Sequence, residues 1–212
     1  MAQTGELTTA LLPTFPDLGP ADRRLVGPLF VLLGQGRPVS PEALARAVGM
    51  PAADVRRRLA AWWGIRYDGD GLIIGFLGLD LFATRHQLRV GQRDVFAWSA
   101  WDALCLPALL GEEAAVASLC PATGDDVRLA VAPAGVLDAE PEDARLALEV
   151  PGPAGGGTGF RQAFCRDVRF LADREAAAEW QRAHPAVQIL SLEQGHRLGQ
   201  RVWRALLGMV EG

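Results

Sequence analysis

Two short helical segments, joined by a Gly-Met-Pro turn, constrain the first third of the chain more than any other feature. The first helix begins at Ser40-Pro41-Glu42, because a serine hydroxyl caps free backbone amides and a proline at the first helical position loses no hydrogen bond. This helix is expected to end at Gly49. Pro51 then opens a second helix, whose spacing turns Val55 and Leu59 inward. Two helices with so short a connection indicate a helix-turn-helix unit.

A hairpin is expected directly after this unit. The segments 63–67 and 72–76 are largely apolar and flank the turn Asp68-Gly69-Asp70-Gly71. Before the unit, the segment from Leu25 to Leu33 repeats apolar residues at helical spacing. Helices followed by a hairpin in this order resemble a winged helix.

Three consecutive arginines on the second helix, Arg56, Arg57 and Arg58, favour a DNA-binding interpretation of this module. The alternative is that they form a solvated face and that the module packs against the rest of the chain. The chain has 25 acidic and 21 basic residues and a formal net charge of -4, so no global basic field attracts nucleic acid. We therefore favour the alternative and do not expect nucleic acid as a partner.

The remainder of the chain mixes short strands with helices and predicts an α+β fold, a winged-helix-like N-terminal module plus a mixed or antiparallel sheet with flanking helices. Strands are expected at 85–90, 95–97, 146–150, 160–171 and 187–190, a hairpin at 116–131, and helices at 98–110, 173–184 and 193–207. The first of these helices is expected to be interrupted at Pro107. Three parts follow: a loosely ordered lead-in at 1–22, the winged-helix-like module at 23–82 and an α/β domain at 83–212. Within the last part, the Gly- and Pro-rich segment 151–159 is expected to be a flexible loop.

The cysteine content and the absence of a long apolar segment predict a cytoplasmic protein without a membrane contact. No window reaches about 18 uninterrupted apolar residues, and the N-terminus lacks the charged and apolar regions of a signal peptide. Cys105, Cys120 and Cys165 are odd in number and widely spaced, which fits reduced thiols better than a disulfide framework.

A structural metal site is not expected from the sequence. No Cys-x-x-Cys or His-x-x-x-His pair occurs. His86, His184 and His196 fall on no recognised ligand spacing. Each is expected to be a surface or helix-capping residue.

The segment 96–109 carries the most unusual combination of residues. Ser99 and Asp102 are three residues apart and share one face of a helix, and Cys105 follows three residues later. A carboxyl group among Trp, Leu and Ala side chains loses water, which raises its pKa toward the range useful for proton transfer. Asp102 is therefore a candidate acid or base. The alternative is that Asp102 pairs with an arginine and that Ser99 bonds back to the helix backbone.

Cys165 is the second candidate residue. It lies between Arg161 and Arg166, whose positive charges would lower the thiol pKa and favour the thiolate that nucleophilic or soft-metal chemistry requires. Strand alternation places Arg166 on the opposite face, which weakens this argument. A single cysteine in a strand is also common as a small core residue. Both interpretations stay open from the local sequence.

Six segments together carry a resemblance that none carries alone. They are GRPVS at 36–40, YDGDGLIIG at 67–75, FAWSAWD at 96–102, PALLG at 107–111, CPATG at 120–124 and RQAFC at 161–165. In this order and spacing they resemble the bacterial organomercurial (alkylmercury) lyase family. The resemblance covers roughly Leu25 to Leu207, nearly all of the chain that we expect to be ordered.

The resemblance implies a winged-helix-like N-terminal part, an α/β catalytic part and protonolysis of carbon–mercury bonds to a hydrocarbon and Hg(II). Soft thiolates would bind the soft metal, and a nearby carboxyl group would deliver the proton. By resemblance, Asp102 is the catalytic aspartate, Cys165 is the second catalytic cysteine and Cys120 is structural. No cofactor is implied. Mercury is substrate and product, the organomercurial is the small-molecule partner, an external thiol assists product release, and a mercuric reductase accepts Hg(II).

Ser99 stands where the family has its first catalytic cysteine. A serine hydroxyl is hard, stays protonated at neutral pH and binds Hg(II) weakly compared with a thiolate. The expected site therefore has Cys165 holding the metal, Asp102 transferring the proton, and Ser99 as a hydrogen-bonding remnant or auxiliary ligand, so that the candidate metal ligands are these same three residues. Cys105 is a candidate surrogate thiol, although its direction on the helix differs from that of Ser99 by about 120°. The alternative functions are a non-enzymatic soft-metal or organometal-binding protein and a winged-helix DNA-binding regulator.

Overall fold

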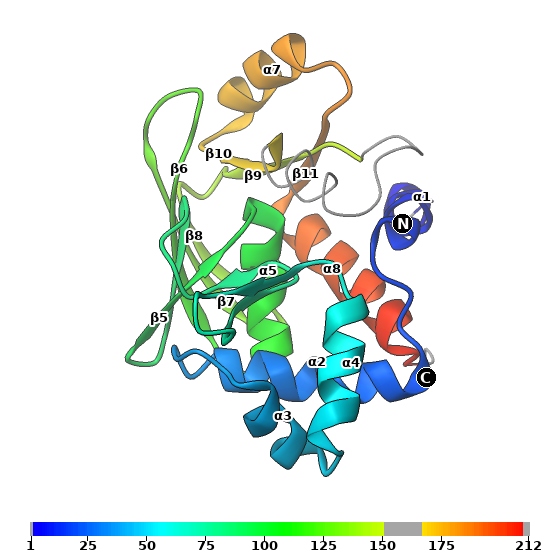
Figure 1. The fold of residues 1–212 in the computed structure, drawn as a ribbon. Coiled ribbons are helices and arrows are strands. Elements are labelled where there is room, and N and C mark those ends of the chain that lie inside the picture. The colour runs from blue at the N-terminus through cyan, green and yellow to red at the C-terminus, as the bar shows by residue number, and fades with distance from the viewer. Residues whose placement is uncertain (1, 151–166, 210–212) are drawn as a thin grey trace.

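The computed structural model describes residues 2–150 and 167–209 (Figure 1). Its helices are α1 (Ala2–Leu11), the short 3-10 helix η1 (Leu12–Thr14), α2 (Pro20–Leu33), α3 (Pro41–Val48), α4 (Ala52–Ala61), α5 (Ala100–Leu110), α7 (Arg174–Ala183) and α8 (Leu192–Leu207). Its strands are β1 (Ile65–Tyr67), β2 (Ile73–Phe76), β3 (Leu79–Asp80), β4 (His86–Val90), β5 (Arg93–Ala97), β6 (Ala114–Leu119), β7 (Asp126–Ala132), β8 (Gly135–Glu140), β9 (Arg145–Leu148), β10 (Arg169–Leu171) and β11 (Gln188–Ser191). The α+β class is confirmed.

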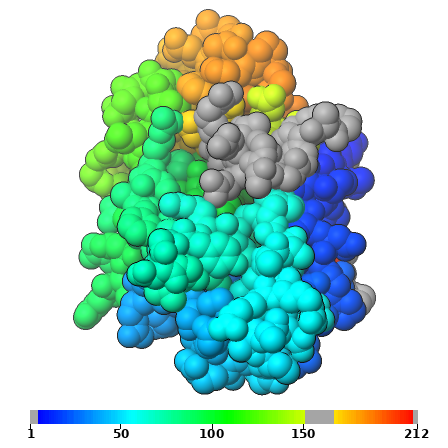
Figure 2. Space-filling model, in the orientation of Figure 1, coloured from blue at the N-terminus to red at the C-terminus, as the bar shows by residue number. Residues whose placement is uncertain are grey.

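Two antiparallel sheets organise the described residues. The larger has eight strands in the order β1-β2-β3-β5-β4-β6-β7-β8, and the smaller has three in the order β10-β9-β11. Neighbouring strands pair antiparallel throughout. In Figure 2, α7 caps one end of the molecule in orange, while α3 and α4 form the other end in blue and cyan.

Helix α5 lies at the centre of the core. One side of it contacts strands β4 to β7, and the other contacts α8 and α2 (Figure 1). Apart from Asp102, its residues are apolar, and Trp101, Leu104 and Leu106 are each at most 1% exposed. A helix without a polar stripe is stable only where protein covers it on all sides. Residues at the start of α5 therefore lie packed between the large sheet and α8.

The helix-turn-helix and hairpin were predicted from local signals, and these are confirmed. The Ser40 hydroxyl accepts a hydrogen bond from the Ala43 amide at 3.1 Å, and Gly49 ends α3 in a left-handed conformation, with φ 67°. Strands β1 and β2 form the hairpin. This hairpin continues through β3 into the large sheet, so the N-terminal module shares one sheet with the chain that follows residue 82.

Two local predictions were wrong. The segment 1–22 is not a loose lead-in, because it contains α1, η1 and the start of α2, with Leu7 and Leu11 buried against the core. The Pro, Thr and Gly residues of this segment suggested a loop, but its apolar residues form a short stripe that packs on α8. Pro107 does not interrupt its helix, since α5 runs through it to Leu110. Burial of most of α5 outweighs the cost of roughly 3 kcal/mol that an internal proline imposes.

The predicted loop at 151–159 and most of the predicted strand at 160–171 lie outside the described residues, and only its last part is seen, as β10. Strands β3 and β8 were not predicted. Among the helices of residues 2–150 and 167–209, none is both long and apolar enough to cross a membrane.

Candidate active site

Ser99 and Asp102 meet at the first turn of α5, as their spacing predicted. Ser99 is the N-cap of the helix, fully buried and with extended backbone. Its hydroxyl accepts a hydrogen bond from the Asp102 amide at 3.1 Å and donates one to Asp102 Oδ2 at 2.7 Å. Serine is among the preferred N-cap residues, because its oxygen satisfies a free amide of the first turn. The predicted bond from Ser99 back to the helix backbone is present, whereas no arginine pairs with Asp102 in the described part of the chain.

The carboxyl group of Asp102 has a pKa close to neutral pH. Burial raises the pKa of Asp102 to about 7, and this outweighs the hydrogen bonds from the Ser99 hydroxyl and backbone, which lower it. The N-terminal end of a helix also favours a negative charge, but only by a fraction of the cost of losing water around a carboxylate. Asp102 therefore exists in both protonation states near pH 7, which suits a group that donates a proton.

A tight turn of the sheet packs directly against this carboxyl group. Leu77 and Gly78 form a two-residue turn between β2 and β3, with φ 34° and 103°. A Cβ at Gly78 would lie 2.5 Å from Asp102 Oδ1. The Gly78 carbonyl accepts a hydrogen bond from the Trp98 amide at 2.8 Å, one residue before Ser99. Glycine at 78 is thus required both by the backbone conformation and by the closeness of Asp102.

A second buried carboxyl group supports the turn from the other side. Asp80, which is fully buried, accepts hydrogen bonds from Trp98 Nε1 at 2.8 Å and from the Phe82 amide at 3.0 Å. The guanidinium of Arg66 on β1 also pairs with it. These bonds satisfy a buried charge and connect the hairpin, β3 and the segment entering α5. Sequence reasoning missed Asp80, because its two side-chain partners, Arg66 and Trp98, are 14 and 18 residues away along the chain.

Comparison with known proteins identifies the family to which the chain belongs. A family model described as alkylmercury lyase matches residues 81–204, and one described as the helix-turn-helix domain of alkylmercury lyase matches residues 5–77. An alkylmercury lyase of Streptomyces lividans is 38% identical over 209 residues, covering 97% of this chain and 95% of the relative. The chain belongs to the alkylmercury lyase family. The predicted resemblance is confirmed.

Two further relatives place the chain within the alkylmercury lyases. A relative of this name from Staphylococcus epidermidis is 34% identical, covering 95% of this chain and 92% of its own length. One from Pseudomonas putida is 39% identical, with 82% and 81% covered. The fold matches the crystal structure of the mercury-bound form of MerB2 with a TM-score of 0.72 at 23% identity, covering 98% of this chain and all of that one.

Of the three cysteines of this alkylmercury lyase family member, the two in the described part of the chain occupy different environments. Cys165 lies outside the described residues, while the Val168 carbonyl, three residues later in the sequence, contacts the Ala100 amide at the start of α5, at 3.5 Å. Cys120 is buried in the turn after β6. Cys105 is buried against α8, and burial, followed by the charge of Asp102, raises the pKa of its thiol well above the ordinary value. Among the described residues, no cluster of three or more His, Cys, Asp and Glu side chains could hold a metal ion.

The histidines were predicted at the surface or at helix ends, and this is right only for His184, which ends α7. His86 and His196 are each only 2% exposed. Burial, then the charges of Arg169 and Arg85, lowers the pKa of His86 to about 3, and its Nδ1 lies 2.8 Å from the Ser118 hydroxyl. His86 is therefore a neutral core residue, and local spacing gave no sign of this.

The arginines of α4 are engaged by acidic partners. Arg56 pairs with Glu42, Arg57 with Asp54 at 2.6 Å, and Arg58 with Asp22 at 2.9 Å. Arg56 and Arg57 remain largely exposed in these pairs, whereas Arg58 is partly buried. The last of these pairs joins α4 to α2, which fits the packing role we preferred for this module.

Proposed function

We propose that this chain cleaves carbon–mercury bonds by protonolysis, releasing a hydrocarbon and Hg(II), and that Asp102 donates the proton. The observation that carries the proposal is the Ser99–Asp102 pair at the start of α5, with the pKa of Asp102 raised to about 7 by burial. Near neutral pH, a carboxyl group with this pKa is still partly protonated, and it is acidic enough to transfer its proton.

The hydrogen bonds indicate which carboxyl oxygen carries the proton. Oδ2 accepts the Ser99 hydroxyl, so the acid proton belongs on Oδ1. Oδ1 is the atom that packs against Gly78, so closely that a Cβ at position 78 would lie 2.5 Å from it. In the proposed step the Oδ1 proton moves to the mercury-bound carbon. The electron pair of the carbon–mercury bond forms the new carbon–hydrogen bond, and the remaining carboxylate balances the charge of Hg(II).

Ser99 acts in this step as a hydrogen-bond donor rather than as a strong metal ligand. A hydroxyl donates a stronger hydrogen bond to a carboxylate than to a neutral carboxylic acid. The Ser99 contact therefore stabilises Asp102 more after proton transfer than before it, which is the condition for catalysis. Ser99 also serves as the cap of α5, and a serine oxygen is a weaker ligand for Hg(II) than a thiolate.

Cys165 is the residue that we propose as the thiolate ligand of mercury. Support comes from the family pattern and from sequence order, because Val168 contacts the start of α5 only three residues later. The proposed substrate is a small organomercurial, with no cofactor besides an external thiol that removes Hg(II). A cytoplasmic location, where small thiols abound, and transfer of Hg(II) to a mercuric reductase belong to the same proposal.

The test is benzene release from phenylmercury by purified protein with excess glutathione. Wild type, Ser99→Cys, Asp102→Ala and Cys165→Ser are compared, with Asp94→Asn as a surface-carboxyl control. Turnover by wild type and by the control, but not by Asp102→Ala or Cys165→Ser, is the expected result. If Ser99→Cys turns over and wild type only binds phenylmercury, the chain is a soft-metal-binding protein, and the proposal is wrong.

A further inference from the structure

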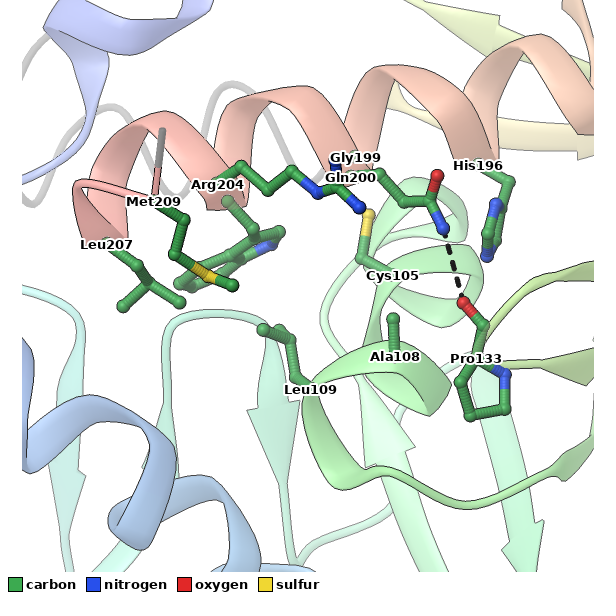
Figure 3. A pocket seen from close by; sticks show the side chains of 11 residues that line it. Cys105, Ala108, Leu109, Pro133, His196, Gly199, Gln200, Arg204, Leu207 and Met209 are labelled. Carbon is green, nitrogen blue, oxygen red and sulfur yellow. Dashed lines mark hydrogen bonds between the residues drawn. The ribbon is translucent and has the colours of Figure 1, made fainter. Parts of the chain in front are cut away.

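A cavity of about 240 Å³ lies between α5 and α8, beside the turn that joins β7 and β8 of the large sheet. Figure 3 shows its two ends: His196 and Pro133 at one, and Leu109, Leu207 and Met209 at the other. Its wall is largely apolar. A dry apolar cavity of about 150 Å³ accommodates benzene, so this one has room for a small aryl or alkyl group.

The Cys105 thiol reaches this cavity because the facing residue of α8 is a glycine. Figure 3 shows the sulfur pointing from α5 toward Gly199. A Cβ at position 199 would lie 2.2 Å from Cys105 Sγ, far inside van der Waals contact. Any other residue at 199 would push the thiol aside. The pair of Cys105 and Gly199 therefore places a soft sulfur atom at the cavity wall.

A second observation indicates a ligand at the same place. His196 lines the cavity and is 2% exposed, and its Nε2 is buried without a hydrogen-bond partner in the described part of the chain. A buried polar atom left unpaired costs about 1–3 kcal/mol. Burial lowers the pKa of His196, opposed by the Ala132 carbonyl, so the ring is neutral at pH 7 and one nitrogen keeps a lone pair.

We propose that this cavity is a second binding site, which takes a monofunctional organomercury cation at Cys105 Sγ, with its organic group against the apolar wall and its mercury beside His196. Mercury bound to one carbon needs a single strong ligand to complete linear coordination, and a thiolate is the ligand that soft metals prefer. One sulfur and one imidazole suit this cation. They do not supply the four ligands of a structural zinc site, and no larger donor cluster occurs within residues 2–150 and 167–209.

Binding proceeds by thiol exchange, because organomercury cations travel as adducts of small thiols. The Cys105 S–H bond and the mercury–sulfur bond of the adduct break. A Cys105 sulfur–mercury bond forms, and the proton leaves on the released small thiol, so no oxidant or reductant is needed. The high pKa of the Cys105 thiol does not prevent this, since the metal replaces the proton. The inference rests on the substrate class proposed above, but not on turnover.

The test measures adducts rather than turnover. The Cys165→Ser protein is treated with phenylmercury acetate in the presence of excess glutathione, and adducts are mapped by mass spectrometry of the intact protein and of its peptides. A phenylmercury adduct is expected on Cys105, still carrying its phenyl group. Cys120, which is also buried, is the internal control, and it should remain unmodified in the folded protein. Because phenyl is retained, failure of this site and failure of the lyase proposal are separate results.

Two variants in the same background test the geometry, and their folding is checked by circular dichroism. His196→Leu keeps the thiol and should weaken competition against glutathione by about 10-fold or more, as for other supporting groups of metal sites. Gly199→Ala should abolish the adduct, since its Cβ takes the place of the sulfur. The proposal is overturned by modification of Cys120 as readily as Cys105, by absence of a Cys105 adduct, or by unchanged binding in both folded variants.

Discussion

Replacing Asp102 with asparagine should remove a distinctive pH dependence of folding stability. The ordinary pKa of the carboxyl group is 3.8, and burial raises it to about 7 in the folded protein. The folded state therefore holds this proton more tightly than the unfolded state does. The stability that the protonated carboxyl group contributes is complete below about pH 4, falls as the pH rises, and is lost above about pH 7.

The size of the effect follows from the separation of the two pKa values, which is about three pH units. One unit corresponds to about 1.4 kcal/mol, which gives an upper limit of about 4 kcal/mol. Asp102 is only partly buried as a whole residue, so solvent screening reduces this, and we expect roughly 2–4 kcal/mol. Asp102→Asn keeps the shape of the side chain but carries no charge at any of these pH values.

The assay is urea unfolding of both proteins from about pH 4 to about pH 8, followed by tryptophan fluorescence. The free energy of unfolding of wild type, minus that of Asp102→Asn, should fall by the stated amount and level off above about pH 7. The buried His86 is common to both proteins, so its contribution cancels. Asp94→Asn is the control, because the Arg89 hydrogen bond lowers the pKa of Asp94 and the sign of its effect is opposite. Parallel stability curves for wild type and Asp102→Asn would refute the reasoning.

Three further predictions concern the surroundings of Asp102. Gly78→Ala should abolish benzene release. Gly71 has a similar positive φ, but a Cβ there would meet no atom within 4 Å, so Gly71→Ala should cost about 1 kcal/mol of stability and leave release unchanged. Equal release by the two variants would contradict the role of Gly78. Ser99→Ala should lose about 1 kcal/mol as a helix cap and move the pH midpoint of benzene release upward, since the Ser99 bonds lower the pKa of Asp102; a downward move would contradict this. The imidazole of His86, followed by NMR, should stay neutral down to about pH 3 or until the protein unfolds; protonation near pH 6.5 would show that its environment is wrongly described.

Local signals were enough to predict the parts of the fold that local chemistry determines. The Ser40 cap, the end of α3 at Gly49 and the start of α7 after Asp173 depend on residues within one helical turn. The shared face of Ser99 and Asp102 is likewise a property of one turn of helix. The upward direction of the Asp102 pKa shift was predicted from its apolar sequence neighbours, although the distant Gly78 also covers this carboxyl group.

The remaining features depend on contacts between distant segments, which no local pattern contains. Gly78 approaches Asp102 only because β3 pairs with β5, and Asp80 finds its partners across the same sheet. The Leu77-Gly78 sequence between two apolar strands was the one available sign of this turn. His196 and Cys105 share a cavity because α5 and α8 cross.

The central claim is that Asp102 donates the proton, and the pH dependence of benzene release tests it most directly. Single-turnover release from phenylmercury is measured for wild type and Asp102→Asn, so that product exchange does not limit the rate. The account predicts a constant rate for wild type below about pH 7, a fall of about tenfold per pH unit above it, and negligible release by the variant throughout. A wild-type rate that does not change across pH 7, together with substantial release by Asp102→Asn, would contradict it.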